Sequence, residues 1–443
     1  MKGLRLPPVM TLLNSILGLA VLITLKGLIG VLEGRRYLHY IQNHFSRLPD
    51  PWMPYASVIL PCKGLEYQLE ENICSVLQQS YPFFEVILVT ATEDDPSRPL
   101  LKKLIHQFPG HKIKLVTAGT SDVRGEKVNN LMSAVNEAEP RSEVLVFTDS
   151  DSRPPRDWLR HLLAPLRDER IGLSTGYRWY FPEPGNLAGI FRSAWNASIA
   201  TLLGNHRHNF AWGGSMAIRR STFESAKVMQ HWSRSLSDDY SMTSAMREAN
   251  LPIHYEPRCL IASFGKCSWP DLLEWSTRQI VITRFYSRKL WRLACLSQGV
   301  FLMTWWGLIA SLSVSLGQTM SGHSHPGAGS LKSLFVVGCF LLVIFLLGVV
   351  RGSYRMKSIQ QIFPGHPEKI QSFWWAYTLL FPLVSTLTGI NLLLSAFTHR
   401  LRWRGVSYDI QAGGIVMVIR REPSGVTLPP ASASCRANLI EEG

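Results

Sequence analysis

The chain of 443 residues lacks the short signatures of several common protein classes. It contains no Gly-x-Gly-x-x-Gly stretch, so the dinucleotide-binding fingerprint of many oxidoreductases is missing. Its seven cysteines include no Cys-x-x-Cys pair, which argues against a structural zinc site. No nucleic-acid-binding motif and no internal repeat is present. The sequence therefore argues against an oxidoreductase, a zinc-stabilised domain and a nucleic-acid-binding protein.

Negative charge is also scarce, since 32 acidic residues stand against 46 lysines and arginines, for a formal net charge of +14. The basic excess is concentrated at the edges of long apolar stretches. Anionic lipid headgroups explain such a distribution better than nucleic acid does. We therefore predict a membrane as partner and no nucleic acid.

Four apolar stretches are long enough to cross a membrane as helices. They are residues 9–32, 300–316, 333–350 and 373–397. The first lacks a small-residue cleavage site, which predicts a retained anchor rather than a signal peptide. Its one charge, Lys26, can snorkel toward the surface from near a helix end. A buried core helix is the alternative for each stretch, but length and apolar purity favour an integral, multi-pass membrane protein.

Flanking charges predict the topology. Arg35 and Arg36 follow the first stretch and Arg288 precedes the second, so both ends of the intervening domain are predicted to be cytoplasmic. Residues 317–329 contain no Lys or Arg and are predicted to lie outside. The basic cluster at 399–404 conflicts with this count if residues 373–397 cross the membrane. We therefore predict a re-entrant or interfacial hairpin broken at Pro382, the alternative being an error elsewhere in the count.

Short apolar strands alternate with amphipathic helices in the central region. The predicted strands are residues 57–61, 84–89, 112–116 and 144–147, and the predicted helices are 71–79, 100–108 and 127–138. This alternation predicts an α/β domain with a mostly parallel, doubly wound sheet. The predicted domains are an anchor at 1–34, a cytoplasmic catalytic domain at 54–290, a membrane region at 297–398, and a tail at 399–443 that is disordered from Pro423.

Two carboxylates, Asp149 and Asp151, come directly after the predicted strand 144–147. In open α/β sheets, ligands bind beyond the carboxyl ends of the strands. Neighbouring carboxylates repel each other unless a cation lies between them, and Mg²⁺ or Mn²⁺ prefers oxygen ligands. A metal there could neutralise a diphosphate, which indicates sugar-nucleotide chemistry. A solvated turn or a helix cap is the alternative.

An ordered set of motifs resembles the family-2 glycosyltransferases with a GT-A fold, and more narrowly their ceramide glucosyltransferase-like branch. The motifs are Val-Ile-Leu-Pro-Cys-Lys-Gly at 58–64, Gln-Gln-Ser-Tyr-Pro at 78–82, Asp-Asp-Pro at 94–96, Lys-Val-Asn-Asn-Leu at 127–131, the segment at Asp149, Gly-Gly-Ser-Met-Ala-Ile-Arg-Arg at 213–220, and Ser-Asp-Asp-Tyr at 237–240. The resemblance covers residues 54–288. It implies a GT-A Rossmann-like catalytic domain joined to transmembrane helices.

The resemblance also implies the donor contacts. An Asp usually holds the uridine after the second strand, but Thr92 occupies that place, so Glu93 and Asp94 remain alternatives. Lys127 is expected to reach a phosphate or the uridine from the start of its helix, where anions are already favoured. An acidic solvated turn and a surface lysine are the competing interpretations. Asp149 and Asp151 become the ligands of Mg²⁺ or Mn²⁺ beside the diphosphate of a UDP-sugar.

On the acceptor side, the resemblance makes Asp239 the general base of a single-displacement, inverting transfer and Asp238 its neighbour or the helix cap. Simple capping of the helix 240–249 by both residues is the alternative.

The remaining substrate contacts implied by the resemblance are Gly213 and Gly214, then Arg278, Gln279 and Arg284 on an amphipathic stretch at 269–286. The Gln/Arg-x-x-Arg-Trp motif of the family is only partly present there, because the spacing differs and Phe285 replaces Trp. An interfacial helix that touches headgroups is the competing interpretation of this stretch.

An aromatic residue and two histidines complete the candidates. Trp212 is expected to line the acceptor pocket or to pack in the core. His206 and His208 form a His-x-His pair without a third ligand at useful spacing, so we expect a loop near the acceptor cleft rather than a metal site.

The sequence therefore predicts a membrane-bound, metal-dependent inverting glycosyltransferase that moves a hexose, glucose by the resemblance, from a UDP-sugar to a lipid hydroxyl such as that of ceramide. Two alternatives remain: a processive polysaccharide synthase, and a non-enzymatic nucleotide-sugar-binding membrane protein or transporter.

Overall fold

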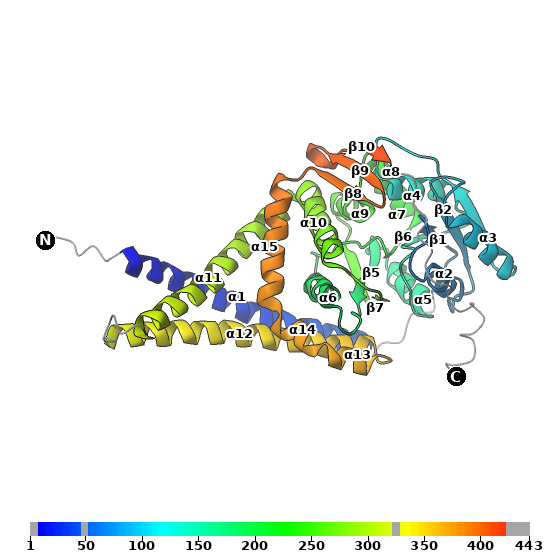
Figure 1. Ribbon diagram of the computed structural model, residues 1–443. Helices are drawn as coiled ribbons and strands as arrows, with labels where there is room; N and C mark the ends of the chain where they lie inside the picture. Colours follow the sequence, from blue (N-terminus) through cyan, green and yellow to red (C-terminus); the bar gives the residue numbers. More distant parts are fainter. Residues whose placement is uncertain (1–7, 46–51, 321–327, 422–443) are drawn as a thin grey trace.

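The computed structural model describes residues 8–45, 52–320 and 328–421. Its central feature is a seven-stranded sheet with the strand order β3-β2-β1-β4-β6-β5-β7 (Figure 1). The strands are β1 (Ala56–Pro61), β2 (Phe84–Thr90), β3 (Ile113–Thr117), β4 (Val144–Thr148), β5 (Leu173–Tyr180), β6 (Ser215–Arg219) and β7 (Ile253–Ser263).

Most neighbours in this sheet are parallel. Strands β3, β2, β1 and β4 pair in parallel, as do β5 and β7, while β6 is antiparallel to both of its neighbours. The predicted mostly parallel α/β sheet is therefore confirmed. Both faces are buried, since Val58 and Leu60 pack into one core and Ile59 into the other, which is why the strands read as continuous apolar runs.

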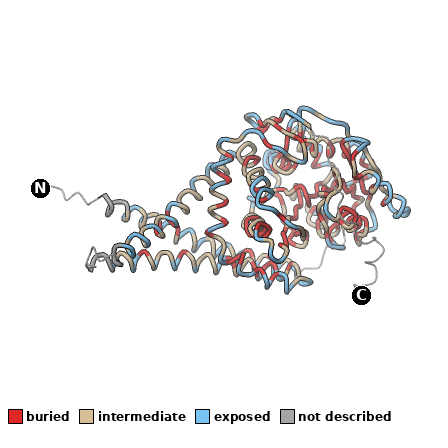
Figure 2. The backbone as a smooth tube through the Cα atoms, viewed as in Figure 1, coloured by how far each residue is buried: buried red, intermediate tan, exposed pale blue. Residues whose placement is uncertain are grey.

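Helices cover both faces of the sheet. One core takes in residues of α2 (Leu69–Leu77), α3 (Arg98–Gln107) and α5 (Trp158–Leu163). The opposite core takes in α4 (Glu126–Asn136), α8 (Val228–Trp232) and α9 (Asp238–Glu248). Helix α6 (Leu187–Ala200) lies between the sheet and the membrane helices, and the short α7 (Arg220–Ser225) follows β6. Figure 2 shows these buried segments gathered inside the α/β domain.

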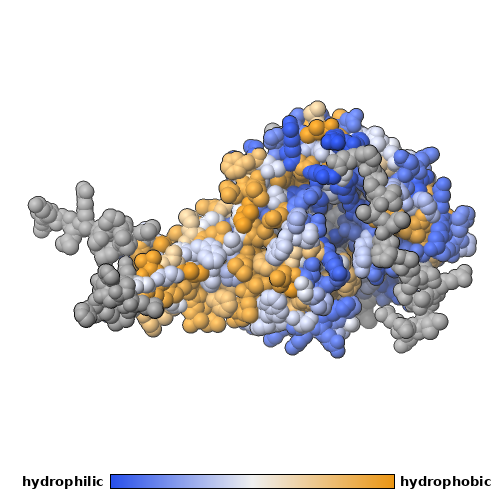
Figure 3. All heavy atoms as spheres, in the orientation of Figure 1, coloured by the Kyte–Doolittle hydropathy of each residue, from blue (hydrophilic) through white to orange (hydrophobic). Residues whose placement is uncertain are grey.

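Three helices are long and apolar enough to span a membrane: Leu13–Phe45 of α1 (Pro8–Phe45), Arg288–Gly317 of α11 (Arg288–Met320) and Lys332–Ile362 of α12 (Ala328–Ile362). They form the long projection on the left of Figure 1. Apolar residues cover this projection and hydrophilic residues dominate the α/β domain (Figure 3). The part of the chain that the structure describes thus holds three candidate spans.

The fourth predicted span is divided. Helix α13 (Pro367–Ser372) leads into α14 (Trp374–Leu379), and Leu380 separates α14 from α15 (Phe381–Phe397), with Pro382 in the first turn of α15. Proline lacks the N–H that would continue α14 through this point. Helix α14 packs along α12, whereas α15 turns away from it toward α10 (Trp269–Tyr286) (Figure 1). The break predicted at Pro382 is present, but the two pieces do not form a hairpin.

The basic cluster at 399–404 begins a small sheet that sequence reasoning placed in a tail. Strands β8 (Arg400–Trp403), β9 (Val406–Ile410) and β10 (Val416–Arg421) pair antiparallel in the order β10-β9-β8. Val406, Tyr408 and Ile410 are buried against Leu236 and Val281 of the α/β domain. The conflict in the charge count disappears, because α15 returns the chain to the α/β domain. The segment from Pro423 onward, predicted to be disordered, lies outside the described residues.

Candidate active site

A cavity of about 2040 Å³ opens at the carboxyl ends of β1 and β4 and extends to the membrane helices. Pro61 and Lys63 line it after β1, and Asp149 and Asp151 line it after β4. Residues of α1, α6, α10 and α11 line the other end. The sheet edge that the sequence marked as a ligand site is therefore continuous with a space that reaches the membrane region.

Asp149 and Asp151 share two basic neighbours. Lys127 Nζ lies 2.7 Å from Asp149 Oδ1, and the Arg178 guanidinium binds Asp151 through contacts of 2.5 and 3.0 Å. Arg178 also lies 3.7 Å from Asp149 Oδ2. Lys127 comes from the first turn of α4 and Arg178 from β5, so two separate elements converge on the carboxylates. Sequence reasoning identified Lys127 but missed Arg178.

The pKa values in this cluster are displaced by these charges. Burial raises the pKa of Asp151, but the adjacent Arg178 outweighs burial and holds the pKa well below its usual range. Burial lowers the pKa of Lys127, but Asp149 and Asp238 outweigh it and raise the pKa. Burial also raises the pKa of Glu66, aided by Asp151, although Arg404 opposes the rise. Acidic side chains of the site are thus each paired with a lysine or an arginine.

The donor set fits a divalent metal. Asp149 and Asp151 keep 22% and 37% of their side-chain surface accessible beside the cavity, and both offer hard oxygen ligands. Glu66 is a third carboxylate of the cavity, and burial first and then the nearby Asp151 and Asp149 raise its pKa. A bound cation would relieve this repulsion between carboxylates. These residues have the chemistry to hold Mg²⁺ or Mn²⁺.

Asp238 faces the same lysine from the other side. Its Oδ2 lies 3.0 Å from Lys127 Nζ, and only 3% of the residue is exposed. Burial, with Asp239 and Asp149 nearby, raises the pKa of Asp238 to about 6. We expected Asp238 to be a possible helix cap, but Ser237 is the N-cap of α9, because its side chain accepts a hydrogen bond from Tyr240 N. Asp238 therefore belongs to the charge cluster.

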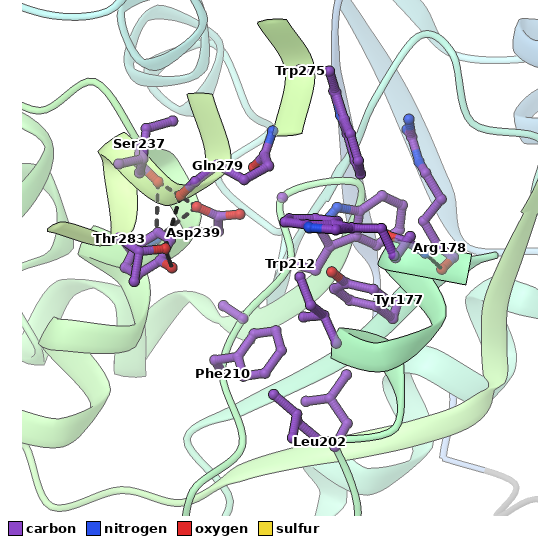
Figure 4. A pocket seen from close by; sticks show the side chains of 18 of the residues that line it. Tyr177, Arg178, Leu202, Phe210, Trp212, Ser237, Asp239, Trp275, Gln279 and Thr283 are labelled. Atoms are coloured by element: carbon purple, nitrogen blue, oxygen red, sulfur yellow. Dashed lines mark hydrogen bonds between the residues drawn. The ribbon is translucent and has the colours of Figure 1, made fainter. Parts of the chain in front are cut away.

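Asp239 points into the cavity next to Asp238. Its Oδ1 accepts hydrogen bonds from the Ser237 hydroxyl and from Tyr240 N, the latter at 2.8 Å. In Figure 4, Asp239 and Gln279 lie on one side of the cavity, and Trp212 and Arg178 lie on the other. The expected base and the expected cationic side of the donor site therefore face a common space.

The Gly213-Gly214 turn allows this close packing. A Cβ on Gly213 would come within 2.1 Å of Asp238 Oδ2 and 2.7 Å of Lys127 Nζ. A Cβ on Gly214 would come within 2.2 Å of the Trp212 ring. Gly213 lines the cavity. Both glycines leave room for neighbouring side chains, which are charged at Gly213 and aromatic at Gly214.

The structure does not bring the expected uridine loop to the cavity. Thr92, Glu93 and Asp94 are exposed and are absent from its lining. The neighbouring Asp95 is instead buried and accepts hydrogen bonds from Gly64 N at 2.9 Å and from the Ser97 hydroxyl at 2.6 Å. This loop stabilises the turn after β1.

Asn130 of α4 lines the cavity, and its buried Oδ1 has no hydrogen-bond partner among the described residues.

The three residues expected on α10 separate. Arg278 and Gln279 line the cavity, and the Arg278 guanidinium lies 5.1 Å from the Trp403 ring centroid. Arg284 is not part of the lining and donates hydrogen bonds to the carbonyl oxygens of Ser395 and Thr398 at the end of α15. The expected substrate contact of Arg284 is therefore not seen, because this side chain caps a helix terminus.

The aromatic and histidine candidates also lie at the cavity. Trp212 lines it, with the Arg178 guanidinium 5.1 Å from its ring centroid. His206 and His208 line it with ring centroids 6.0 Å apart, and no group of metal-ligand type among the described residues includes either one. Both histidines are in a loop of the cavity wall, and its place near the acceptor stays a prediction.

One histidine–carboxylate cluster has the ligand types and spacing of a metal site, within the residues that the structure describes. His44 Nε2 lies 2.6 Å from Glu256 Oε2, with His254 Nε2 at 4.0 Å from the same oxygen. These residues join the end of α1 to β7, outside the lining of the cavity. Arg258 N donates to Glu256 Oε1 at 3.0 Å, so this carboxylate already has protein partners.

A GT-A sheet and a cluster of carboxylates and basic groups at its edge define a glycosyltransferase. The family model for glycosyl transferase family 21 matches residues 21–416. The chain belongs to that family.

Curated relatives share only part of their length with this chain. Ceramide glucosyltransferase 1 of Caenorhabditis elegans is 25% identical over 207 residues, which is 46% of this chain and 44% of that protein. Ceramide glucosyltransferase of Pyricularia oryzae is 32% identical over 126 residues, 23% of this chain and 26% of that protein. Both alignments thus span less than half of these relatives.

Among solved structures, the mannosyltransferase PcManGT from Pyrobaculum calidifontis in complex with GDP-Man and Mn²⁺ is 14% identical, with a TM-score of 0.43. The match covers 86% of this chain and 97% of that one.

Proposed function

We propose that this protein transfers a hexose from a UDP-sugar to the hydroxyl group of a membrane lipid, with inversion at the sugar carbon. The observation that carries the proposal is the continuity of one cavity, which joins Asp149, Asp151 and Asp239 to the apolar surfaces of α1 and α11. A ceramide-like lipid is the acceptor that the relatives support, since two are named ceramide glucosyltransferases.

The donor end of the cavity would hold the diphosphate. Asp149 and Asp151 would hold Mg²⁺ or Mn²⁺, which when bound supplies positive charge that stabilises the leaving diphosphate. Lys127 and Arg178 already lie against these carboxylates, so their cationic groups are in place to pair with phosphate oxygens. Asn130, with its unpartnered oxygen, is a hydrogen-bond acceptor for a donor group of the nucleotide.

The acceptor end would supply the base. Asp239 takes the proton from the lipid hydroxyl as the oxygen attacks the sugar carbon, and the diphosphate leaves on the opposite side. Ser237 and the N–H of Tyr240 orient the carboxylate by donating to Oδ1, so Oδ2 is the oxygen that receives the proton. One displacement of this kind inverts the anomeric centre and needs no covalent glycosyl-enzyme intermediate.

The lipid would reach Asp239 from the end of the cavity that is lined by α1 and α11. Apolar side chains line the membrane end of the cavity and are at least half exposed: Ile29 of α1, Leu202 after α6, and Leu290 and Leu293 of α11. Such side chains can bind acyl chains while the headgroup lies deeper in the cavity. A cytoplasmic catalytic domain, indicated by Arg35, would give a cytosolic UDP-sugar access to the donor end.

Comparison of the lipids of a host with and without the gene tests this function. Mass spectrometry should detect a lipid heavier by one hexose only in cells that carry the active gene. An unchanged lipid profile, together with a new extracellular polysaccharide, would support a polysaccharide synthase instead.

A further inference from the structure

The tip of the β8–β9 hairpin reaches the donor end of the cavity. Trp403 pairs with Val406, so the turn consists of Arg404 and Gly405. Both have positive φ angles, 48° and 74°, as in a type I′ turn. Such turns favour Asn, Asp or Gly at the first central position. The turn conformation therefore does not explain why residue 404 is an arginine. We look for the reason in the contacts of its side chain.

The Arg404 side chain lies among the carboxylates of the site. It forms an ion pair with Glu66 and retains 38% of its side-chain surface. It lines the same cavity as Asp149 and Asp151. Burial lowers the pKa of Arg404, but Glu66, Asp151 and Asp149 outweigh it and raise the pKa. The guanidinium is thus held fully charged at the cavity wall, on a side chain that is more than a third exposed.

The catalytic domain holds this hairpin firmly. The Tyr408 hydroxyl accepts a hydrogen bond from Glu126 N at 3.2 Å. At the end of β10, Arg421 donates to the carbonyl oxygen of Ser121 at 2.5 Å. Tyr408 and Val406 are both only 1% exposed. Since the strands share a buried core with Leu236 and Val281, the position of Arg404 is defined by the fold, as a ligand-binding side chain requires.

We propose that Arg404 is a cationic finger that binds the diphosphate of the donor. Glu66 pairs with the guanidinium, and the guanidinium turns to the phosphate oxygens when a nucleoside diphosphate binds. The planar fork of an arginine matches two phosphate oxygens at once. Glu66 then keeps the Ser150 hydroxyl as its partner. This role rests on the proposed function, because it assumes a nucleoside diphosphate at Asp149 and Asp151.

A comparison of two ligands tests the role. Binding of UDP and of uridine, with Mn²⁺ present, is measured by calorimetry on the full chain in detergent. Arg404→Ala should weaken UDP binding about 10- to 100-fold, the effect of losing a charge-assisted contact. It should leave uridine binding unchanged, because uridine has no phosphate. Arg404→Lys should fall between wild type and Arg404→Ala.

Arg400→Ala is the matched control, because Arg400 is an exposed arginine of the same hairpin that does not line the cavity. It should bind UDP like the wild type. An unchanged UDP affinity in Arg404→Ala would overturn the role, and so would an equal loss for UDP and uridine, which indicates a purely structural residue. If the wild type bound no UDP and no other nucleoside diphosphate, the proposed function itself would fail.

Discussion

Lys127 bridges two carboxylates that come from different parts of the sequence. Its Nζ lies 2.7 Å from Asp149 Oδ1 and 3.0 Å from Asp238 Oδ2. Asp149 follows β4 and Asp238 begins α9, so this one ammonium joins the expected metal-binding end of the cavity to the helix that carries the expected base. The two halves of the proposed reaction are therefore coupled through a single side chain.

Loss of this ammonium should impair the donor step. Lys127→Ala leaves Asp149 and Asp238 close together without their shared cation, and we expect kcat/KM for the UDP-sugar to fall at least about 10²-fold, roughly 3 kcal/mol of transition-state stabilisation. Lys127→Arg keeps the charge but changes the geometry, so an intermediate loss is expected. Steady-state kinetics with both variants check this. Wild-type kinetics in Lys127→Ala would contradict the bridging role.

The metal prediction concerns Asp149 and Asp151. EDTA should inactivate the wild type, and added Mn²⁺ or Mg²⁺ should restore transfer. Asp149→Asn should lower transfer at least about 10²-fold, because an amide is a weaker ligand for a hard cation. Transfer assays across a metal titration measure both effects. Full activity of the wild type in metal-free buffer would remove this assignment.

The two aspartates that begin α9 should differ in what they affect. Asp239→Asn removes basicity but little volume, so UDP binding should survive while transfer falls by about 10²–10⁴-fold. Asp238→Asn should act on the donor, because it neutralises one of the two carboxylates that Lys127 contacts, and UDP binding should weaken. Calorimetry and single-turnover kinetics on the same preparations separate the two. If Asp238→Asn abolished transfer with normal UDP binding, the base would have to be reassigned.

This expectation for Asp238 differs from the one that the sequence supports, and the reason is physical. Two acids in the first turn of a helix fit capping equally well, and a sequence cannot show which side chain points inward. The structure buries Asp238 against Lys127 and gives the cap to Ser237. Local sequence patterns therefore identify the Asp238-Asp239 motif but not the separate role of each aspartate.

The same limit applies on a larger scale. The sequence predicts the alternation of strands and helices, and the position of Asp149 and Asp151 after a strand, because both depend on local apolar periodicity. Arg178 and Arg404 were missed, since nothing near either residue marks it as a neighbour of those carboxylates. Arg404 in particular reaches the site only because α15 does not continue as a span and β8–β10 fold back onto the catalytic domain.

Stability should depend on pH through His254. Burial lowers the pKa of His254 to about 4, from a usual value of 6.5. The unfolded chain therefore binds more protons than the folded chain between these values, and stability should be lost as the pH falls from about 6.5 to about 4, by on the order of 2–3 kcal/mol. Thermal unfolding in detergent across this range measures the loss.

His254→Gln should flatten that dependence, because glutamine does not titrate. The matched control is His106→Gln, which removes an exposed histidine of α3 and should leave the dependence as in the wild type. A wild-type slope in His254→Gln would show that another group causes the loss.

The most direct test of the whole account is lipid glycosylation by the purified chain in liposomes. Radiolabelled UDP-glucose and other UDP-hexoses are supplied with Mn²⁺ to vesicles that contain ceramide or diacylglycerol, for the wild type and for Asp239→Asn. The account predicts a labelled lipid with an inverted, β-linked hexose from the wild type, and a product reduced by about 10²–10⁴-fold from the variant. A lipid product with retained α configuration, or equal product from both proteins, would contradict it.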